Sequence, residues 1–464
     1  MYQRIDGERL GKMLLEIPLE FRIGTLYRQI ADHLEKMILA GSIPCGARLP
    51  GTRELARTLG VSRSTVVEAY LLLEKRGVVR LKGRSGAFAA SELLPHLVRS
   101  PEEKNIFNFD SERPTRDLVP FAALAKISRE ALLEDEGNVL GGSPPEGLEE
   151  LRFALLEHSV LRGIPARPGE MAVTSGGKDA LSTVLRSLRA GGYCRVFAEK
   201  LTYSDMKDIA ANEGLPLRPV PLLGEDGLAA LEKLTSRDIL YLVPSFQNPT
   251  GRTLSQEIRR EILALRERKG FLIIEDDSYG ELRYGEKSVP ALKALDEGEG
   301  VIYIGSFSQV LFPGMRLGYI LLPPGLRNGY VRTASFRQGQ TSSLVQLVML
   351  KFIQQGKLAE AIERARTVLS ARMESLVRGL ADAFPGVSAH RPEGGVFLWF
   401  PTGKTDGSEA ARSASRKGVF VTDGALYSLG KKPQKAVRFS ISSVPAGKMS
   451  EACARLVQCW GSFI

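Results

Sequence analysis

The chain has 464 residues and a mass of 50.7 kDa, which corresponds to roughly two to four domains. Hydrophobic residues make up 43% and charged residues 25% of it, an ordinary globular composition that excludes a wholly disordered chain. No apolar run reaches the roughly 18 residues of a membrane-spanning helix, and residues 1–20 lack the apolar core of a secretory signal, so we expect a cytoplasmic protein.

The formal net charge of +10 is unevenly placed along the chain. Residues 43–90 contain nine lysines and arginines and three acidic residues, so this stretch alone carries +6. Such a concentration indicates either a polyanionic partner or an ordinary solvated face. Cysteines and histidines are scattered, so we expect neither a metal site nor a disulfide framework; the cysteines are Cys45, Cys194, Cys453 and Cys459.

The first predicted element is a helix over residues 25–40, where apolar residues recur at helical spacing. A second, short helix is expected to end before Gly60, which permits a tight turn. Ser62 is a good N-cap for a third helix, and the stretch VVRLKGRSGAF then predicts two short strands around Lys82–Gly86. This order indicates a helix-turn-helix followed by a β-wing.

The third helix and the wing offer side chains that suit base edges and phosphates. The candidate DNA contacts are Arg48, Arg53, Ser62, Arg63, Ser64, Thr65, Lys82 and Arg84.

The string RLPGTRELARTLGVSRSTVVEAYLLLEKRG, with GRSGAF after it, resembles the winged helix-turn-helix of the GntR superfamily of bacterial regulators. The resemblance covers roughly residues 25–89, and the serine usual after the proline is Gly51 here. It implies double-stranded operator DNA as the partner. The alternative is a winged helix retained only as a protein-interaction module.

We divide the chain into a DNA-binding domain over residues 1–89, a linker over 90–115 and a larger domain over 116–464. The linker prediction rests on weak periodicity, a charge cluster and two prolines.

In the larger domain, short apolar runs alternate with amphipathic helical stretches such as Asp179–Arg189 and Ser255–Lys269. This alternation predicts an α/β domain with a mostly parallel central sheet. The expected strands are Met171–Thr174, Cys194–Ala198, Ile239–Val243, Phe271–Glu275 and Val301–Gly305. Ligands of such sheets bind in the loops beyond the carboxyl ends of the strands.

Several polar residues follow these strands. The stretch TSGGKDAL opens a helix after the first strand, where backbone N–H groups suit a phosphate. Any one of the others is ordinary as a turn or a cap, so their order along the chain is the informative feature. They are Asn248, Asp276, Tyr279, Ser306, Ser308 and Arg316, with Arg438 on a later strand.

This ordered set resembles the fold-type I aminotransferases, which use pyridoxal phosphate (PLP). The resemblance implies that Asn248 and Tyr279 contact the ring 3-oxygen and that Tyr203 stacks on the ring. It implies that Asp276 pairs with the pyridine nitrogen, keeping it protonated and the ring an electron sink. It also adds a small C-terminal α+β subdomain to the expected fold.

The resemblance assigns the remaining residues to the two ends of a ligand. Ser306, Ser308 and Arg316 would hold the phosphate, together with the backbone of Ser175, Gly176 and Gly177. Arg438 would receive the carboxylate of a substrate or effector. A GntR-type winged helix fused to such a domain is the layout of the MocR-type regulators, which implies a homodimer.

One departure from the family bears on mechanism. The motif SFSK of the family reads SFSQ here, so Gln309 stands where the family's lysine bonds to PLP. A carboxamide can neither form a Schiff base nor move the substrate α-proton. Three further departures are Gly142 for a tyrosine, Leu201 for a proline and Lys178 for a polar residue, often glutamine. We regard Lys178 as an unsuitable substitute, because the motif places it on another loop.

Three interpretations of the pocket stay open. PLP or a PLP–amino acid adduct binds without a covalent link and acts as an effector; the pocket takes another small anion; or the domain is only a dimerisation scaffold. The sequence therefore favours a DNA-binding transcription regulator that senses a small molecule without catalysis. The alternative is an active PLP-dependent aminotransferase with an appended DNA-binding domain.

Overall fold

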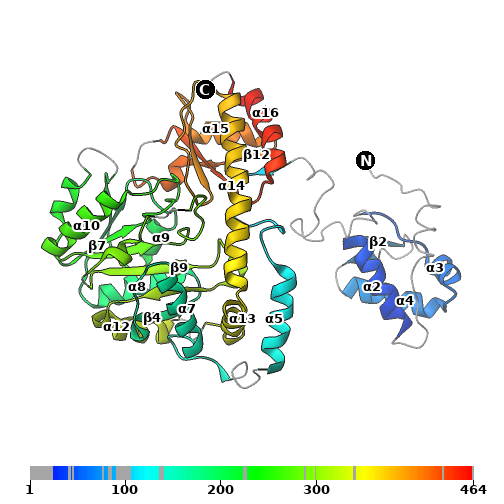
Figure 1. Cartoon of the computed structure of the whole chain (residues 1–464). Coiled ribbons are helices and arrows are strands. Elements are labelled where there is room, and N and C mark those ends of the chain that lie inside the picture. The colour runs from blue at the N-terminus through cyan, green and yellow to red at the C-terminus, as the bar shows by residue number, and fades with distance from the viewer. Residues whose placement is uncertain are drawn as a thin grey trace. The chain divides into compact units, whose positions relative to one another are not determined.

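The computed structural model describes residues 25–461 apart from 40–42, 44–45, 76–77, 82–85, 90–105, 135–140, 223–226, 287–288, 298, 338–340 and 431–432. The chain divides into two compact units, Met1–Asn105 and Ile106–Ile464. Each unit is described by itself (Figure 1).

Within its described residues, the first unit has three helices and a hairpin: α2 (Leu26–Leu39), α3 (Thr52–Leu59), α4 (Arg63–Lys75), β1 (Val79–Leu81) and β2 (Ala87–Ala89). Apolar residues from all five elements form one core, including Leu34, Leu55 and Val66. Gly60 ends α3 with a φ of 64°, a left-handed conformation that glycine adopts without strain. Ser62 caps α4, because its Oγ accepts from the backbone N–H of Thr65 at 3.1 Å. The predicted helix-turn-helix and hairpin are both present.

The linker prediction extended ten residues too far. Residues 107–108 form β3 (Phe107–Asn108), which pairs in parallel with β12 (Val419–Phe420) of the larger unit. Phe109 is fully buried and packs edge-on against Phe439, with ring centroids 5.2 Å apart. These aromatic side chains bury apolar surface against the larger unit, so residues 106–115 belong to it.

A seven-stranded sheet organises the larger unit, in the order β4-β10-β9-β8-β7-β5-β6. All neighbouring strands run parallel except β10, which is antiparallel to both β4 and β9. The strands are β4 (Met171–Thr174), β5 (Arg195–Glu199), β6 (Leu217–Val220), β7 (Asp238–Leu242), β8 (Leu272–Asp276), β9 (Val301–Ser306) and β10 (Gly318–Leu321).

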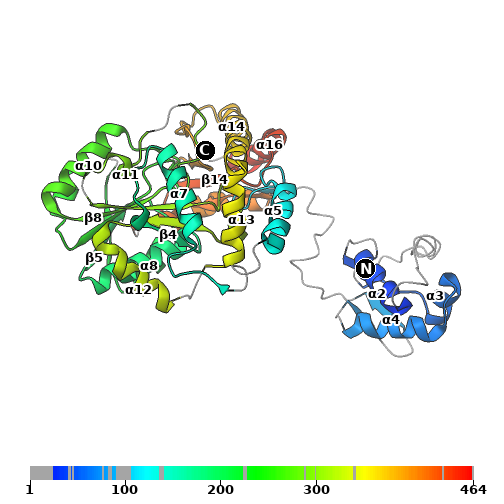
Figure 2. The same ribbon diagram turned by 60° about the horizontal axis from the view of Figure 1, so that its bottom comes forward.

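Helices cover both faces of this sheet. Figure 2 shows α8 (Gly177–Ala190) and α12 (Pro324–Arg337) on one face and α10 (Gln256–Lys269) and α11 (Leu292–Leu295) on the other. Alternate residues of β7 accordingly enter different cores, with Ile239 in one cluster and Leu240 in the other. Burial on both faces explains why the central strands are apolar throughout.

Further helices flank the sheet and lead to a small C-terminal subdomain. They are α5 (Phe121–Glu134), α7 (Glu149–Leu161), α9 (Met206–Asn212), α13 (Ser343–Gln354) and the long α14 (Lys357–Ala383). The subdomain adds an antiparallel sheet, β11-β14-β13, built from β11 (Phe397–Pro401), β13 (Thr422–Asp423) and β14 (Ala436–Ser440), with α15 (Gly407–Ser415) and α16 (Met449–Trp460). None of the described helices is long and apolar enough to cross a membrane.

Glu199, the last residue of β5, makes the stability of the larger unit depend on pH. Its carboxyl group is buried and accepts a hydrogen bond from Gln247 Nε2 at 3.2 Å. Burial raises the pKa of Glu199 from 4.5 to about 8, against the smaller opposing effect of that hydrogen bond. The native state therefore retains a proton that the unfolded chain releases, and stability falls as pH rises from about 4.5 to about 8.

We expect Glu199→Gln to remove this dependence, since an amide keeps the shape and has no proton to lose. The stability of the wild type relative to the variant should fall by about 1.4 kcal/mol per pH unit between pH 5 and 7, so the variant should be flatter and more stable at pH 7. Urea unfolding followed by tryptophan fluorescence measures this, because both tryptophans, Trp399 and Trp460, lie in the larger unit. The exposed Glu267→Gln is the control, and equal pH slopes in wild type and Glu199→Gln would contradict the assignment.

Candidate functional site

A pocket of about 290 Å³ lies where the loops after β7, β8 and β9 meet the start of α8. This volume is near the lower end for small-molecule sites. A groove of about 850 Å³ lies elsewhere, beside Tyr284 and Arg391, but it gathers none of the predicted residues. Those that line the smaller pocket are Gly177, Tyr203, Asn248, Asp276, Tyr279, Ser306, Ser308, Gln309 and Arg316.

Asp276 ends β8 and is held from two sides. Tyr241 donates its hydroxyl to Oδ2 at 2.9 Å, while Ser278 donates its backbone N–H and its hydroxyl to Oδ1 at 3.2 and 2.5 Å. Burial raises the pKa of Asp276 above its ordinary value, although these hydrogen bonds act in the opposite direction. The carboxyl group is thus fixed in orientation inside the pocket. Sequence reasoning missed Tyr241 and Ser278, although Ser278 lies two residues from Asp276 in EDDSYG.

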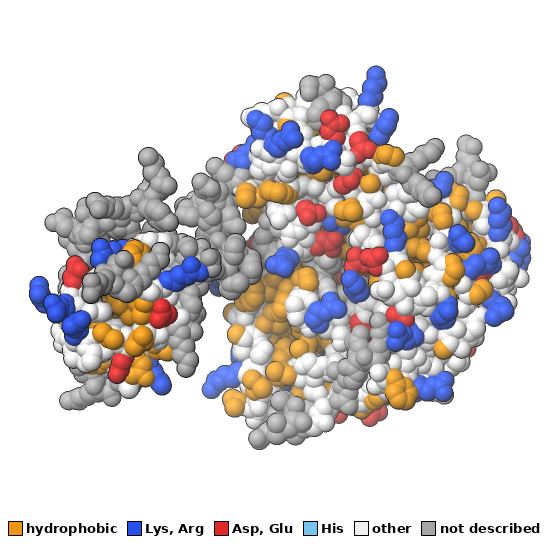
Figure 3. All heavy atoms as spheres, turned by 180° about the vertical axis from the view of Figure 1, so that it is seen from behind, with side chains coloured by type: hydrophobic (Ala, Val, Ile, Leu, Met, Phe, Trp, Pro, Cys, Tyr) orange, Lys and Arg blue, Asp and Glu red, His pale blue; other side chains and the backbone are white. Residues whose placement is uncertain are grey.

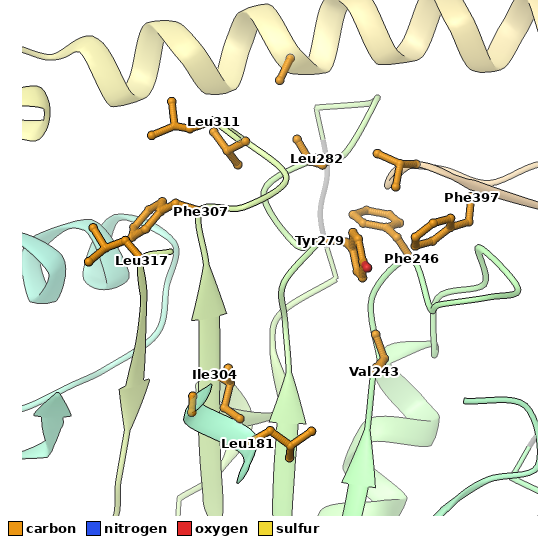
Figure 4. Packing of buried hydrophobic residues seen from close by; sticks show 14 of the residues in the cluster. Leu181, Val243, Phe246, Tyr279, Leu282, Ile304, Phe307, Leu311, Leu317 and Phe397 are labelled. Carbon is orange, nitrogen blue, oxygen red and sulfur yellow. The ribbon is translucent and has the colours of Figure 1, made fainter. Parts of the chain in front are cut away.

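Asn248, Tyr279 and Arg438 form a connected row. Asn248 Nδ2 donates to the Tyr279 hydroxyl at 3.3 Å, and Arg438 Nη1 donates to Asn248 Oδ1 at 3.1 Å. Tyr279 packs edge-on against Phe397, in the cluster with Phe246 shown in Figure 4. The Arg438 guanidinium lies over the Phe397 ring, 4.3 Å from its centroid. Aromatic packing therefore fixes both ends of the row.

The opposite end of the pocket gathers groups that suit an anion. Gly177 is the first residue of α8, whose N-terminus presents unpaired N–H groups and the positive end of the helix dipole. A Cβ on Gly177 would lie 3.3 Å from Ser278 Oγ, and one on Gly176 would lie 3.5 Å from Arg316 Nη1. Arg316 has a φ of 49°, a left-handed conformation rare outside glycine and often found at functional sites.

Two residues assigned to this end lie just outside the pocket lining. Ser175 donates its N–H to Asp179 Oδ2 at 2.9 Å, and its hydroxyl pairs with that of Thr341 at 3.3 Å. Gly176 lies between Ser175 and the helix with a φ of 92°. Ser306 and Ser308 are linked to each other, since Ser308 N–H donates to Ser306 Oγ at 3.3 Å.

Gln309 lines the pocket and contacts a residue that sequence reasoning missed. Its Nε2 donates to Glu112 Oε2 at 3.2 Å, and Glu112 Oε1 accepts from Arg438 Nη1 at 2.7 Å. Burial disfavours the charged form of Arg438, but Glu112, Tyr427 and Tyr279 together outweigh burial and raise the Arg438 pKa above its usual value. Glu112 lies in the stretch predicted as linker, and no local pattern marks it, because the β3–β12 pairing positions it.

Lys178 also lines the pocket, but its amine is paired at the rim. Lys178 Nζ lies 2.6 Å from Asp205 Oδ2, and Tyr203 donates its hydroxyl to the same oxygen at 2.8 Å. Burial acts to raise the pKa of Asp205, yet the hydrogen bonds from Lys178 and Tyr203 leave it below its ordinary value. Lys178 and Tyr203 are therefore fixed through one carboxylate.

The first unit presents its predicted DNA contacts at the start of α4 and around it. Arg48, Arg53, Ser62, Arg63 and Ser64 are exposed, and Thr65 is half-buried. Arg63 Nε donates to Thr52 Oγ1 at 3.4 Å, which joins the two helices of the motif. Lys82 and Arg84 lie outside the described residues.

Comparisons with known proteins agree with both units. Residues 104–456 match the model of the class I and II aminotransferases, and residues 26–89 match that of the gntR family of bacterial regulatory proteins. The "Probable rhizopine catabolism regulatory protein MocR" of Rhizobium meliloti is 29% identical, covering 77% of this chain and 78% of its own. The "Uncharacterized HTH-type transcriptional regulator YdcR" of Escherichia coli is 28% identical, covering 89% and 94%.

Among solved structures, LysN, the alpha-aminoadipate aminotransferase of Thermus thermophilus complexed with N-(5′-phosphopyridoxyl)-L-leucine, is 29% identical with a TM-score of 0.71. The similarity covers 78% of this chain and 93% of LysN. The fold is thus that of the fold-type I aminotransferases, which normally bind PLP. The chain belongs to the class I and II aminotransferase family and carries, ahead of that domain, a helix-turn-helix domain of the gntR family.

Proposed function

We propose that the protein is a transcription regulator that binds operator DNA and senses a small ligand, without Schiff-base catalysis. The observation that carries this proposal is the pocket, which pairs an anion-binding end with a fixed carboxyl group while Gln309 lines its wall. We assign Gln309 to the lysine position of the family. The candidate ligands are PLP, a PLP–amino acid adduct or another small anion.

The residues present fit PLP held without a covalent link. The α8 N-terminus, Ser306, Ser308 and Arg316 would hold its phosphate, and Asp276 would accept a hydrogen bond from the ring nitrogen. Asn248 and Tyr279 would face the ring oxygen, and Tyr203 would lie against the ring. PLP supplies an electron sink when bound. Without a lysine at position 309, the chain's own groups bind and orient it but move no α-proton.

The regulator assignment draws on the first unit and on the relatives. A capped recognition helix with exposed Arg63 and Ser64 suits the major groove, and both named relatives are called regulators.

We further propose a homodimer. Large apolar side chains are exposed on the larger unit, among them Phe121, Leu132 and Leu133 of α5, and Figure 3 shows apolar groups gathered on one of its faces.

The second candidate function is an active aminotransferase. The similarity to LysN and the retained Asp276 favour it, and Gln309 is the feature against it. Repeated turnovers of an amino acid with a keto acid, lost in Asp276→Ala, would establish this alternative.

Arg63→Ala tests the DNA-binding half of the proposal. Arg63 is exposed in the first turn of α4, where an arginine reads guanine through two hydrogen bonds. We expect a loss of about 1–3 kcal/mol, roughly 5- to 150-fold in affinity, for an operator selected from genomic DNA, and a smaller loss for random DNA. Fluorescence anisotropy on labelled duplexes measures both.

Arg268→Ala is the control, because it removes the same charge from an exposed site on the larger unit. Equal losses on both duplexes would show that Arg63 contacts only the backbone. A wild-type protein without sequence preference, or with an affinity indifferent to salt, would contradict DNA regulation altogether.

A further inference from the structure

The pocket contains a carboxylate of the chain itself at the position where a ligand's carboxylate is expected. Glu112 reaches Arg438 with one oxygen, at 2.7 Å, and Gln309 with the other, at 3.2 Å. The Arg438 side chain is only 3% exposed, whereas that of Glu112 is 31% exposed. The buried cation is thus fixed, while the carboxylate comes from the pocket rim.

Arg438 is incompletely satisfied by these contacts. Its Nη2 makes only long hydrogen bonds, to Asp110 O at 3.5 Å and Thr422 Oγ1 at 3.4 Å. Its buried Nε has no hydrogen-bond partner among the described residues. A carboxylate that met the guanidinium with both oxygens would form the stronger, forked pair, so Glu112 occupies Arg438 without saturating it.

Glu112 lies in a short segment, residues 110–116, that is held in place at both ends and that we call the arch. On one side, β3 pairs with β12, and the next residue, Phe109, is buried against Phe439. On the other side, Asp117 Oδ2 accepts from the buried Arg372 Nη2 at 2.8 Å. The arch begins a few residues after residue 105, where the first unit ends. A movement of Glu112 would therefore take place near the start of the larger unit, a few residues along the chain from the end of the first unit.

We propose that Glu112 is a resident carboxylate that holds Arg438 until the carboxylate of a ligand displaces it. This inference rests on the proposed ligand-sensing function. Ligands with a carboxylate, such as a phosphopyridoxyl amino acid, compete with Glu112 and release the arch. Ligands that lack the carboxylate bind with Glu112 still in place. The pocket would then distinguish the two classes and report the difference at the chain segment that leads to the DNA-binding unit.

The test uses two probes that differ only in the α-carboxylate: N-(5′-phosphopyridoxyl)-L-leucine and N-(5′-phosphopyridoxyl)-3-methylbutylamine. Calorimetric titration of the full chain gives both affinities. We expect Glu112→Gln to bind the leucine probe about 10-fold more tightly than wild type, because the charged competitor is gone. The amine probe should bind both proteins equally. Glu232→Gln, an exposed carboxylate paired with Arg268, is the control and should bind both probes like wild type.

Hydrogen exchange on the wild-type protein gives a second readout that needs no variant. Deuterium uptake of residues 106–117 should rise with the leucine probe and stay unchanged with the amine probe. Equal affinities in wild type and Glu112→Gln, with unchanged uptake, would overturn the role of Glu112 while leaving ligand binding intact. Weaker binding of the amine probe to Glu112→Gln would also overturn it, by making Glu112 a direct ligand group. Failure of both probes to bind any variant would overturn the proposed ligand function itself.

Discussion

Replacing Gln309 by lysine is expected to turn reversible binding of PLP into covalent attachment. Gln309 lines the pocket three residues after the end of β9, and its side chain reaches Glu112 beside Arg438. A lysine amine at this position can condense with the aldehyde of PLP, with loss of water, which the carboxamide cannot do. After borohydride reduction, the mass of Gln309→Lys should increase by one reduced PLP group, and that of the wild type should not.

Lys178 provides the control for this experiment. Its amine is 2.6 Å from Asp205 and shares that carboxylate with Tyr203, so we expect no attachment there. The mass increase of Gln309→Lys should therefore persist when Lys178→Ala is added. A mass increase in the wild type that disappears in Lys178→Ala would contradict the assignment. It would instead favour the alternative of an active aminotransferase in which Lys178 bonds to PLP.

Replacing Trp460 by alanine is expected to lower the free energy of unfolding of the larger unit by about 3–5 kcal/mol. Trp460 is fully buried at the end of α16, stacks on Phe400 and contacts Phe384 and Phe439. Alanine removes these contacts and leaves a cavity that the surrounding β11–β14 sheet cannot fill. The same sheet carries Arg438, so the variant should also weaken binding of carboxylate ligands.

Trp460→Phe separates packing from hydrogen bonding in this cluster. Trp460 Nε1 donates to Ala410 O at 3.0 Å, and phenylalanine keeps most of the aromatic contact but loses that hydrogen bond. We expect Trp460→Phe to cost about 1–3 kcal/mol, less than Trp460→Ala, in urea unfolding followed by circular dichroism. Equal costs for the two variants would show that stacking contributes little.

The sequence predicts much of this fold because burial leaves a clear pattern. The five expected strands are all present, each displaced by at most one residue, since strands covered on both faces are apolar throughout. Two strands of the seven-stranded sheet were not predicted. β6 is an edge strand with exposed residues and a proline, and β10 is a four-residue antiparallel insertion directly after the Arg316 loop. β6 therefore lacks the apolar continuity of the central strands, whereas β10 is buried throughout but has only four residues.

The residues of the candidate site also fall into two groups, those that the sequence could predict and those that it could not. Residues at strand ends or in the loops that follow them, such as Asp276 and Asn248, could be predicted, because the topology brings those ends together. Glu112 could not, because it reaches the pocket through the pairing of β3 with β12, across more than 300 residues. Tyr241 could not either, because a tyrosine inside an apolar strand gives no sign that its hydroxyl faces Asp276.

The most direct test of the account measures DNA affinity and PLP attachment on one sample. The full chain is titrated onto an operator selected from genomic DNA, with and without PLP, and the same protein is then reduced with borohydride and weighed. Non-covalent sensing predicts that PLP changes the operator affinity by at least about 5-fold, with no increase in mass. An unchanged affinity at saturating PLP, or a mass increase in the wild-type chain, would contradict it.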